Sequence, residues 1–506
     1  MKIIIPIAGN SDEFIDKFNT LKPLTKVGDS TVIDKFIGSF KFNLEYIFIC
    51  RLEDILNTNL IEKLNSLKIK KKIIIIDHIT NNIIDTILSA DKHIKKKDAI
   101  IIAHPDSIIK FNKNHFLKQI NNSIDGLIFT YNHFNPTFLD SDLVGRCILD
   151  AEENVLQVKE KSQFNPKEQT LAGVYYYSNW NDFKIYAKKT FLNQSPINGM
   201  FYVSQIYNEY IKENKIIKNY RVKKFISLGL TKNIEEFNFW YEYSNILKKN
   251  KKNKILFNHV NLIPACGVGK RFADEGYDKI KPLIKIKNKT MLQSTIDSLP
   301  RSKKNTVIIL REHQNEYDLV SKHRKMKNTN FLILDNKTDG MSRTCMKAKE
   351  MLDENQPLLI SSCDYSVVFN ENKFKSILDT VDPDVVIWTF KGYPDARIQP
   401  YAYAYIEENN GYVTNISEKI PISSTPHKDK VVQGIFYFKT AKLFYEASNI
   451  MFKNKNHVNG EYYIATSINE LILRNKKVIS FAVEKYICWG TPFDLKTYEY
   501  WISLYK

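Results

Sequence analysis

The chain has 506 residues, of which 43% are hydrophobic and 26% are charged, and its formal net charge is +18. At roughly 100–200 residues per domain, this length predicts two to four domains. The excess of positive charge would suit a partner such as nucleic acid or an acidic membrane. However, the lysines are dispersed and no arginine–aromatic cluster or known binding motif occurs, so we expect neither nucleic acid nor a membrane as a partner.

The cysteines and the start of the chain indicate a cytoplasmic protein. The six cysteines form no Cys-x-x-Cys pair and have no zinc-like spacing to histidine. Reduced, mostly buried thiols fit the cytoplasm. The apolar run from Met1 to Ile5 is too short for a signal peptide, and Pro6 interrupts it. No apolar stretch approaches the ~20 residues that a membrane helix needs.

Seven short sequences from the first half of the chain recur in the same order in the second half. The first-half members are IPIAG at Ile5, LKPL at Leu21, TNNIIDTILSA at Thr80, IIAHPDS at Ile101, VKEKS at Val158, AGVYYYS at Ala172 and NGMFYVSQIYNEYI at Asn198. Their counterparts are IPACG at Ile263, IKPL at Ile280, TDGMSRTCMKA at Thr338, LISSCDY at Leu359, ISEKI at Ile416, QGIFYFK at Gln433 and NGEYYIATSINELI at Asn459. Because both the order and the spacing are kept, we predict two copies of one domain of roughly 250 residues.

The two copies meet in a lysine-rich stretch. The sequence ILKKNKKNKILFN, which begins at Ile246, is a poor candidate for a core and is typical of a solvated linker or a frayed helix end. We therefore predict a first domain over residues 1–245, a linker over 246–258 and a second domain over 259–506.

The second copy alternates short β-rich runs with amphipathic stretches. The runs VNLIPA, TVIILR, NFLILD, PLLISS and DVVIWTF are separated by segments such as MLQSTIDSLP and SRTCMKAKEMLDE. This alternation indicates a mainly parallel sheet that is covered by helices on both faces. The later runs YAYAYIEE, GYVTNISE and VVQGIFYF lack long helices between them, so we expect antiparallel additions. The predicted fold class is α/β, with two tandem Rossmann-like domains built on a mixed, mainly parallel sheet.

The first strand of the second copy ends in a glycine-rich turn that is followed by two cations. Gly267 and Gly269 come first, and Arg271 and Lys281 follow. Glycines let the backbone approach a phosphate closely, and the N–H groups of the turn and of the next helix form an anion site. Arg271 adds a bidentate phosphate partner, and Pro282 stiffens the segment that can bring Lys281 over the same site. Glycines alone would fit any tight turn, so the two cations carry the prediction of a phosphate site.

The sequence IPACGVGKRF…KIKPLIKI resembles the signature of nucleotidyltransferases that act on sugar phosphates, the Rossmann-like pyrophosphorylases. The resemblance covers residues 259–506, and an eroded form of it covers the first copy. Within that family, EKIPIS and GTPFDL look most like a subgroup of capsule and surface-glycan biosynthesis. Some members of this subgroup are cytidylyltransferases for small phosphorylated alcohols or amides.

The resemblance implies a reaction, its partners and a cofactor. A phosphate oxygen of a phosphorylated small-molecule acceptor attacks the α-phosphorus of a nucleoside triphosphate, and pyrophosphate leaves. Such a transfer depends on positioning and charge neutralisation rather than on covalent catalysis. Mg²⁺ typically bridges the phosphate oxygens and is held by a carboxylate and water. A homo-oligomer is a further possibility.

The resemblance also assigns roles to single residues. It implies catalysis by Arg271, Lys281 and Asp364, with Asp364 as the metal ligand, nucleotide binding by Ala265, Gly267, Gly269 and Gly340, and acceptor binding by Glu418, Lys419, Gly434 and Glu461. Independently of the family, Asp364 follows a buried strand, where open α/β sheets place ligand-binding groups. Gly434 precedes a strand and would allow close approach of a substrate. Plainer alternatives remain: Asp364 as a helix N-cap, Glu418 as part of an exposed ion pair, and Glu461 as a carboxylate at a helix start.

One position departs from the family pattern. Many members carry a second metal-binding aspartate two residues before the glycine of the Gly-Thr pair, and this chain has Cys488 there. Asp494 follows later and is a candidate cap for the last helix. Either one Mg²⁺ held by Asp364 suffices, or another carboxylate substitutes.

The first copy departs at more positions. Glu13 aligns with Arg271, Ser11 with Gly269, Asn82 with Gly340 and Met200 with Glu461, while Lys22, Asp106, Lys161 and Gly173 are kept. A carboxylate in place of the phosphate-binding arginine repels a triphosphate, at a cost of roughly 1–4 kcal/mol for like charges 4 Å apart. We therefore predict a folded but catalytically silent first domain. The competing hypothesis is a domain that binds another ligand, such as the acceptor alone.

Other functions fit parts of the pattern. A nucleotide- or sugar-phosphate-binding protein without catalysis would keep the fold, and a scaffold would need only the packing of two copies. A glycosyltransferase of related fold often carries an Asp-x-Asp metal motif, and Asp382-Pro383-Asp384 is the obvious match. That motif precedes a strand, at the end of the sheet away from the expected ligand. Intact Gly267, Arg271 and Asp364 favour the active transferase.

Overall fold

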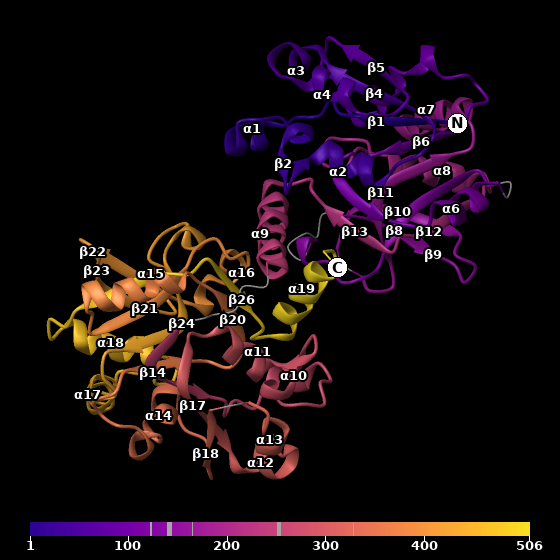
Figure 1. Cartoon of the computed structure of the whole chain (residues 1–506). Coiled ribbons are helices and arrows are strands. Elements are labelled where there is room, and N and C mark those ends of the chain that lie inside the picture. Colours follow the sequence, from indigo (N-terminus) through magenta and orange to yellow (C-terminus); the bar gives the residue numbers. More distant parts are fainter. Residues whose placement is uncertain (122–123, 139–143, 164, 250–254, 327, 506) are drawn as a thin grey trace. The chain divides into compact units, whose positions relative to one another are not determined.

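A computed structural model describes residues 1–121, 124–138, 144–163, 165–249, 255–326 and 328–505. The chain forms two compact units, Met1–Glu242 and Tyr243–Lys506. In Figure 1 the first unit runs from indigo to magenta and the second from magenta to yellow. Among the described residues, no helix combines the length and the apolar character that a bilayer-spanning segment needs.

The first unit is built on a nine-stranded mixed sheet. Its strands are β1 (Lys2–Pro6), β4 (Glu45–Arg51), β5 (Lys71–Ile76), β6 (Ile100–Ala103), β8 (Gly126–Tyr131), β9 (Val144–Leu149), β10 (Val155–Ser162), β11 (Gln169–Tyr177) and β12 (Ile217–Arg221). Strands β5, β4, β1 and β6 are parallel, and β11 joins them antiparallel. The two-stranded sheets are β2 (Lys26–Val27) with β3 (Ser30–Thr31), and β7 (Ser107–Lys110) with β13 (Lys224–Ser227).

Helices pack on both faces of this sheet. The helices of the unit are α1 (Asp12–Phe18), α2 (Val32–Ser39), α3 (Leu52–Asn57), α4 (Leu60–Ser66), α5 (Ile83–Leu88), α6 (Lys113–Ile120), α7 (Trp180–Asn193), α8 (Ile206–Lys212) and the first part of α9 (Thr231–Lys248). Successive residues of β1 enter two different cores: Ile3 packs with Phe36 of α2, whereas Ile4 packs with Ile84 of α5. This alternation follows from the period of two along a strand, and it is why the strand is apolar throughout.

The second unit has the same order of elements and the same order of strands. Its sheet consists of β14 (Leu256–Pro264), β17 (Arg301–Leu310), β18 (Thr329–Leu334), β19 (Leu358–Ser361), β21 (Val385–Phe390), β22 (Ala404–Asn409), β23 (Tyr412–Glu418), β24 (Val431–Phe438) and β25 (Val478–Ala482). The two-stranded sheets are β15 (Lys285–Ile286) with β16 (Lys289–Thr290), and β20 (Tyr365–Val368) with β26 (Lys485–Cys488). The predicted α/β fold class with two tandem domains is confirmed.

The helices of the second unit follow the order of those of the first, with α16 as an addition among the described residues. They are α10 (Lys270–Asp274), α11 (Met291–Ser298), α12 (Arg311–Tyr317), α13 (Leu319–Lys322), α14 (Met341–Met346), α15 (Glu371–Ser376), α16 (Asp395–Ile398), α17 (Ala441–Lys453), α18 (Ile464–Ile472) and α19 (Pro492–Ile502). The expected antiparallel strands are present, and β24 lies between β19 and β21 inside the sheet rather than at its edge. That central position places β24 beside the end of β19.

The region between the units contains a helix. The boundary at Glu242 falls inside α9, which continues to Lys248, and β14 begins at Leu256. The predicted linker over 246–258 thus includes the last residues of α9 and the first of β14. Residues 250–254 of that linker lie outside the described residues.

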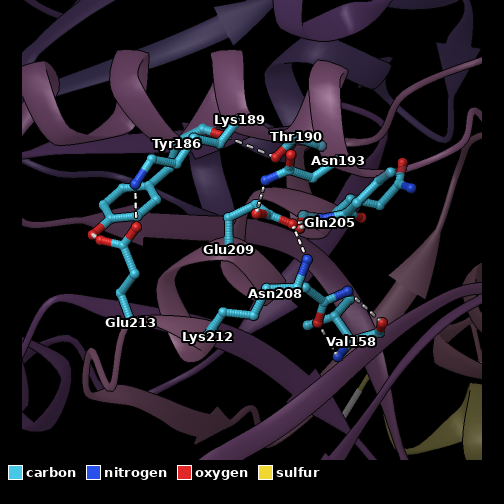
Figure 2. Close-up of polar contacts among 11 residues, drawn as sticks. Val158, Tyr186, Lys189, Thr190, Asn193, Gln205, Asn208, Glu209, Lys212 and Glu213 are labelled. Carbon is cyan, nitrogen blue, oxygen red and sulfur yellow. Dashed lines mark hydrogen bonds and ion pairs between the residues drawn. The ribbon is translucent and has the colours of Figure 1, made fainter.

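An asparagine that both units share ties a helix to a strand. Asn208 of α8 accepts a hydrogen bond from the Val158 N–H at 2.8 Å and donates one to the Val158 carbonyl at 2.9 Å (Figure 2). Asn469 of α18 makes the same pair of contacts with Ile416, at 3.0 and 2.9 Å. The repeated Asn in the two halves of the sequence therefore has a structural cause.

The glutamate that follows this asparagine is buried in both units. Figure 2 shows Glu209 beside Asn193 at the end of α7, from which it accepts a hydrogen bond at 2.9 Å. Glu209 also accepts one from Gln194 at 2.8 Å. Its counterpart Glu470 accepts one from Asn456 at 3.0 Å. The side chains are only 3% and 5% exposed, and buried carboxylates need such partners. This repeated block is explained by packing and not by a ligand.

Candidate functional site

An ion pair marks the edge of the sheet in the second unit where β14 and β19 end. Lys281 Nζ lies 2.6 Å from Asp364 Oδ2, and each side chain is 19% exposed. The Ser362 hydroxyl donates to the other carboxylate oxygen at 2.5 Å. Asp364 precedes a strand, β20, and not a helix, so the alternative of a helix N-cap is wrong.

Both members of this pair stay charged at neutral pH. Burial alone would raise the pKa of the Asp364 carboxyl, but the charge and hydrogen bond of Lys281 hold it below its usual value. Burial likewise would lower the pKa of Lys281, but Asp364 holds it above its usual value. The Lys281 ammonium has three N–H donors. It donates one hydrogen bond to Asp364, and its other N–H groups can donate to an incoming anion.

The glycine turn lies against this pair. Gly269 has φ +67°, and a Cβ atom there would come within 3.4 Å of Lys281 Cβ and 3.5 Å of the Lys281 backbone nitrogen. These are ordinary van der Waals distances, so it is the left-handed backbone conformation that favours glycine at this position. A Cβ at Gly267 would meet no protein atom within 4 Å, so the space beside this glycine is open.

Arg271 is exposed and makes no hydrogen bond or ion pair with any other described residue. It lines a cavity of about 370 Å³ together with Lys281 and Asp364. Because Lys281 is paired with Asp364, the unpaired guanidinium of Arg271 is the group that adds positive charge to this part of the cavity. Guanidinium geometry suits phosphate oxygens.

The structure brings six of the predicted site residues to one cavity. Its lining includes Arg271, Lys281, Asp364, Glu418, Lys419 and Gly434. The other predicted residues, Ala265, Gly267, Gly269, Gly340 and Glu461, lie outside that lining. Ala265 donates its N–H to the Ile308 carbonyl at 2.7 Å, as part of the sheet.

The glutamate of the Glu-Lys pair is partly buried instead of fully exposed. Burial raises the pKa of Glu418 to about 7, although the neighbouring Lys419 opposes this. Within the described part of the chain, its carboxylate accepts no hydrogen bond. Lys419 has φ +63°, donates to the Ala402 carbonyl at 2.7 Å and lies 5.4 Å from the centre of the Tyr463 ring.

Gly434 lies inside β24 and not before it, which corrects the sequence-based position. It has φ +97°, and a Cβ atom there would come within 3.4 Å of the Tyr365 ring. The Tyr365 hydroxyl donates to the Gly434 carbonyl at 2.9 Å. Glu461 is exposed, and its carboxylate interacts with the Tyr463 hydroxyl, so it reaches the cavity wall only through that tyrosine.

Gly340 has a structural explanation. Its φ is +134°, and a Cβ atom there would come within 2.4 Å of the Tyr462 nitrogen and 2.7 Å of its oxygen. The Tyr462 carbonyl also accepts the Ser342 N–H at 3.1 Å. Two backbone segments thus touch at Gly340, and only glycine fits there.

The region around Cys488 offers little to a second metal ion. Asp494 caps α19, because it accepts the Thr491 N–H at 2.9 Å and the Thr491 hydroxyl at 2.7 Å. Burial and the adjacent Asp494 and Asp364 raise the pKa of the Cys488 thiol, and a thiol is a poor Mg²⁺ ligand. Among the described residues, no three His, Cys, Asp or Glu side chains are grouped to hold a metal.

The Asp-x-Asp motif is at the other end of its strand. Asp384 accepts the Lys477 N–H at 2.8 Å, and Asp382 pairs with Lys439 at 2.5 Å. Both precede β21, whose far end at Phe390 pairs with Val431 near the cavity. Its carboxylates therefore have structural partners away from the candidate site.

The corresponding region of the first unit keeps the ion pair and loses the arginine. Lys22 Nζ lies 3.5 Å from Asp106 Oδ2. Glu13, in place of the arginine, accepts a hydrogen bond from the hydroxyl of Thr231, the first residue of α9. Asn82 caps α5 by accepting the Asp85 N–H at 3.1 Å. These replacements have roles in the fold of the first unit.

Sequence reasoning missed several residues of the cavity. Tyr365, Gln433, Tyr463 and Tyr486 line it as well. Tyrosines in apolar runs are usually core residues, so no pattern singled them out. Gln433 was detectable as a polar residue inside the apolar run VVQGIFYF.

No protein-family model matches this chain, and no curated protein matches it. Among solved structures, it is similar to the nucleoside-diphosphate-sugar pyrophosphorylase from Vibrio cholerae RC9, with 19% identity over 47% of this chain and 98% of the other, and a TM-score of 0.39. It is also similar to the inositol-1-phosphate CTP transferase from T. maritima, with 15% identity, coverage of 50% and 98%, and a TM-score of 0.38. A third similar structure is a UDP-glucose pyrophosphorylase complexed with UDP-glucose. Its identity to this chain is 14%, the match covers 48% of this chain and 98% of the other, and the TM-score is 0.39.

Proposed function

We propose that the second unit transfers a nucleotidyl group from a nucleoside triphosphate to a phosphorylated small-molecule acceptor and releases pyrophosphate. The observation that carries this proposal is the Lys281–Asp364 pair at the rim of a cavity, beside an Arg271 that has no partner among the described residues. The resemblance of the glycine turn to nucleotidyltransferase signatures supports it. A phosphorylated sugar is the acceptor we favour, in a pathway of surface-glycan or capsule synthesis.

The chain's own groups suit this transfer. Arg271 would bind the triphosphate, and Lys281 would donate to the α-phosphate or to the attacking phosphate. Both cations stabilise the charge that builds up on the phosphate oxygens, and such stabilisation is the largest part of catalysis in phosphoryl chemistry. Gly267 and Gly269 leave room for the triphosphate next to the backbone.

Mg²⁺ fits this site only as an ion that arrives with the nucleotide. Asp364 supplies one carboxylate, and Mg²⁺ at nucleotide sites takes one or two carboxylates with phosphate oxygens and water. Asp364 would hold the ion, which when bound neutralises phosphate charge. Lys281 would keep the carboxylate in place, because its own charge holds the Asp364 pKa low.

We infer that the first unit does not catalyse the reaction. Its Glu13 carboxylate stands at the sequence position of Arg271 and caps α9, so it supports the fold and opposes a triphosphate. The Lys22–Asp106 pair alone provides one cation and one anion, with no net charge to attract a nucleotide.

The test is pyrophosphate release by the full chain with Mg²⁺, each of CTP, UTP, dTTP, GTP and ATP, and a panel of sugar, alditol and amine phosphates. We expect one combination to turn over. Arg271→Ala should then lower kcat/KM by about 10²–10³-fold, as expected for loss of one charge-stabilising donor. Lys270→Ala, which removes the neighbouring exposed cation outside the cavity, is the matched control and should have little effect. No turnover with any combination would favour a non-catalytic binding protein.

A further inference from the structure

A buried carboxamide in the cavity wall lacks hydrogen-bond partners. Gln433 of β24 is 3% exposed, yet within the described part of the chain neither its side-chain oxygen nor its nitrogen has a partner. It lines the same cavity as Lys281 and Asp364. Buried amides almost always find partners in folded proteins, so an exception at a cavity points to a group that the cavity receives.

The local fold does not explain this residue. Gly434, next to Gln433, has φ +97°, and the pairing of β21 with β24 is irregular between Ile387 and Thr389. In the first unit, Ala172 of β11 occupies the corresponding place and the sheet keeps the same strand order. A small apolar residue therefore satisfies the fold, and the carboxamide is not needed for packing.

Gln433 belongs to the part of the cavity that we assign to the acceptor. Glu418, Gly434 and Tyr463 line the cavity with it, whereas Gly267 and Gly340, which we assign to the nucleotide, lie outside the lining. A carboxamide is neutral and offers both donors and an acceptor. Its best partner is a group of the same kind, a hydroxyl or another carboxamide.

We propose that Gln433 is a specificity-determining residue that selects phosphorylated acceptors carrying a hydroxyl or carboxamide, through hydrogen bonds with its side-chain amide. This inference rests on the proposed function, which assigns this cavity to the phosphorylated acceptor. It disfavours purely alkyl phosphates, which leave the amide unpaired, and ammonium groups, which can pair with the amide oxygen but cannot accept its N–H. A site built to hydrogen-bond a substrate group discriminates strongly against the analogue without it.

The first experiment needs no catalysis. Thermal unfolding of the ligand-free full chain is compared for wild type, Gln433→Leu and Gln433→Ala. Because the leucine side chain has no unpaired polar atoms, Gln433→Leu should raise Tm by about 2–4 °C. Gln433→Ala introduces the residue that the first unit has at this position. It serves as a second variant in case the shape of leucine itself disturbs the fold. A lower Tm for both variants would show that the amide has a structural partner, and would overturn the proposal.

The second experiment measures selectivity by calorimetry with glucose 1-phosphate, its single-deoxy analogues, ethyl phosphate and 2-aminoethyl phosphate. We expect wild type to prefer a hydroxylated probe and to lose affinity for one deoxy analogue. Gln433→Leu should weaken binding of the hydroxylated probe about 10- to 100-fold, the cost of leaving its buried hydroxyl unpaired. The variant should also lose the distinction between this probe and its deoxy analogue. Ethyl phosphate binding should be unchanged.

A matched control separates selectivity from stability. Thr306 of β17 also has a buried hydroxyl without a partner among the described residues, and it lies outside the cavity lining. Thr306→Val should therefore raise Tm without changing the selectivity. Equal selectivity in wild type and Gln433→Leu, or no binding of any hydroxylated probe to wild type, would overturn the proposal. If only the proposed transferase activity is wrong, wild type should still bind the hydroxylated probe selectively but release no pyrophosphate.

Discussion

The two units of this chain share a fold and an ion pair but differ in where their polar groups find partners. Lys281–Asp364 and Lys22–Asp106 occur at the same place in each sheet. In the second unit, Arg271 is unpaired among the described residues, whereas Glu13 of the first unit caps a helix. The ion pair that both units share is therefore compatible with a role in folding alone. The unpaired Arg271, which only the second unit has, is available to a ligand.

The two Glu-Lys pairs show the same contrast. Glu160 of the first unit accepts a hydrogen bond from the Ser204 hydroxyl. Ala465 replaces that serine in the second unit, so Glu418 has no such donor. Burial raises the pKa of both carboxyls, and only in Glu160 does a serine hydrogen bond oppose this effect. The first unit has satisfied its site groups internally, and the second leaves them facing a cavity.

The largest effect is expected from neutralising the aspartate of one ion pair at a time. Asp364→Asn should remove nearly all Mg²⁺-dependent turnover, because the amide keeps the shape and loses the charge. It should also destabilise the chain by about 1–2 kcal/mol, discounted from the ~3–5 kcal/mol of a fully buried pair because both side chains are partly solvated. Pyrophosphate release and urea unfolding measure the two effects.

The matched change in the first unit is Asp106→Asn. It should leave turnover within about twofold, a difference of ~0.4 kcal/mol. Turnover that falls equally in both variants would mean that the first unit takes part in catalysis, and the comparison between the units would fail.

A second prediction concerns what the units share. Asn208→Ala and Asn469→Ala each leave one strand N–H and one carbonyl without their side-chain partner. Each should destabilise its unit by about 1–3 kcal/mol, the cost of buried polar groups left unpaired. Hydrogen exchange of the Val158 amide would report the stability of the first unit, and exchange of the Ile416 amide would report that of the second. Unequal effects would contradict a common structural role for this repeated residue.

A smaller effect concerns pH. The folded-state pKa of Glu418 is raised above its unfolded value, so this carboxyl favours the folded state below about pH 4.5 and loses that contribution as the pH rises through about 7. The loss should amount to about 1 kcal/mol, since the group is partly solvated. Glu418→Gln should remove this part of the pH dependence in unfolding experiments. An unchanged profile would mean that Glu418 ionises normally.

Much of the fold could be predicted from the sequence because its strands are apolar runs and its two halves repeat. The run TVIILR predicted the second half of β17, but β17 starts earlier, at Arg301. Its polar start RSKKN has low β propensity and forms a strand only because it pairs with β14. Tertiary pairing of this kind is not visible in a local pattern.

The candidate site was predictable to the extent that it consists of charged residues near glycines. Arg271, Lys281 and Asp364 stood out, and the structure places them around one cavity. Gln433 did not, because its significance depends on the absence of partners in three dimensions. The raised pKa of Glu418 was equally hidden, since it depends on burial in the folded chain.

The most direct test of the difference between the units is the number of nucleotides bound per chain. Calorimetric titration of the full chain with each Mg²⁺–NTP should give one site, and Arg271→Glu, which installs the residue of the first unit, should abolish it. Lys270→Glu places the same charge change outside the cavity and should retain one site. Two sites per chain, or one site that survives Arg271→Glu and disappears with Asp106→Asn, would contradict the assignment of nucleotide binding to the second unit alone.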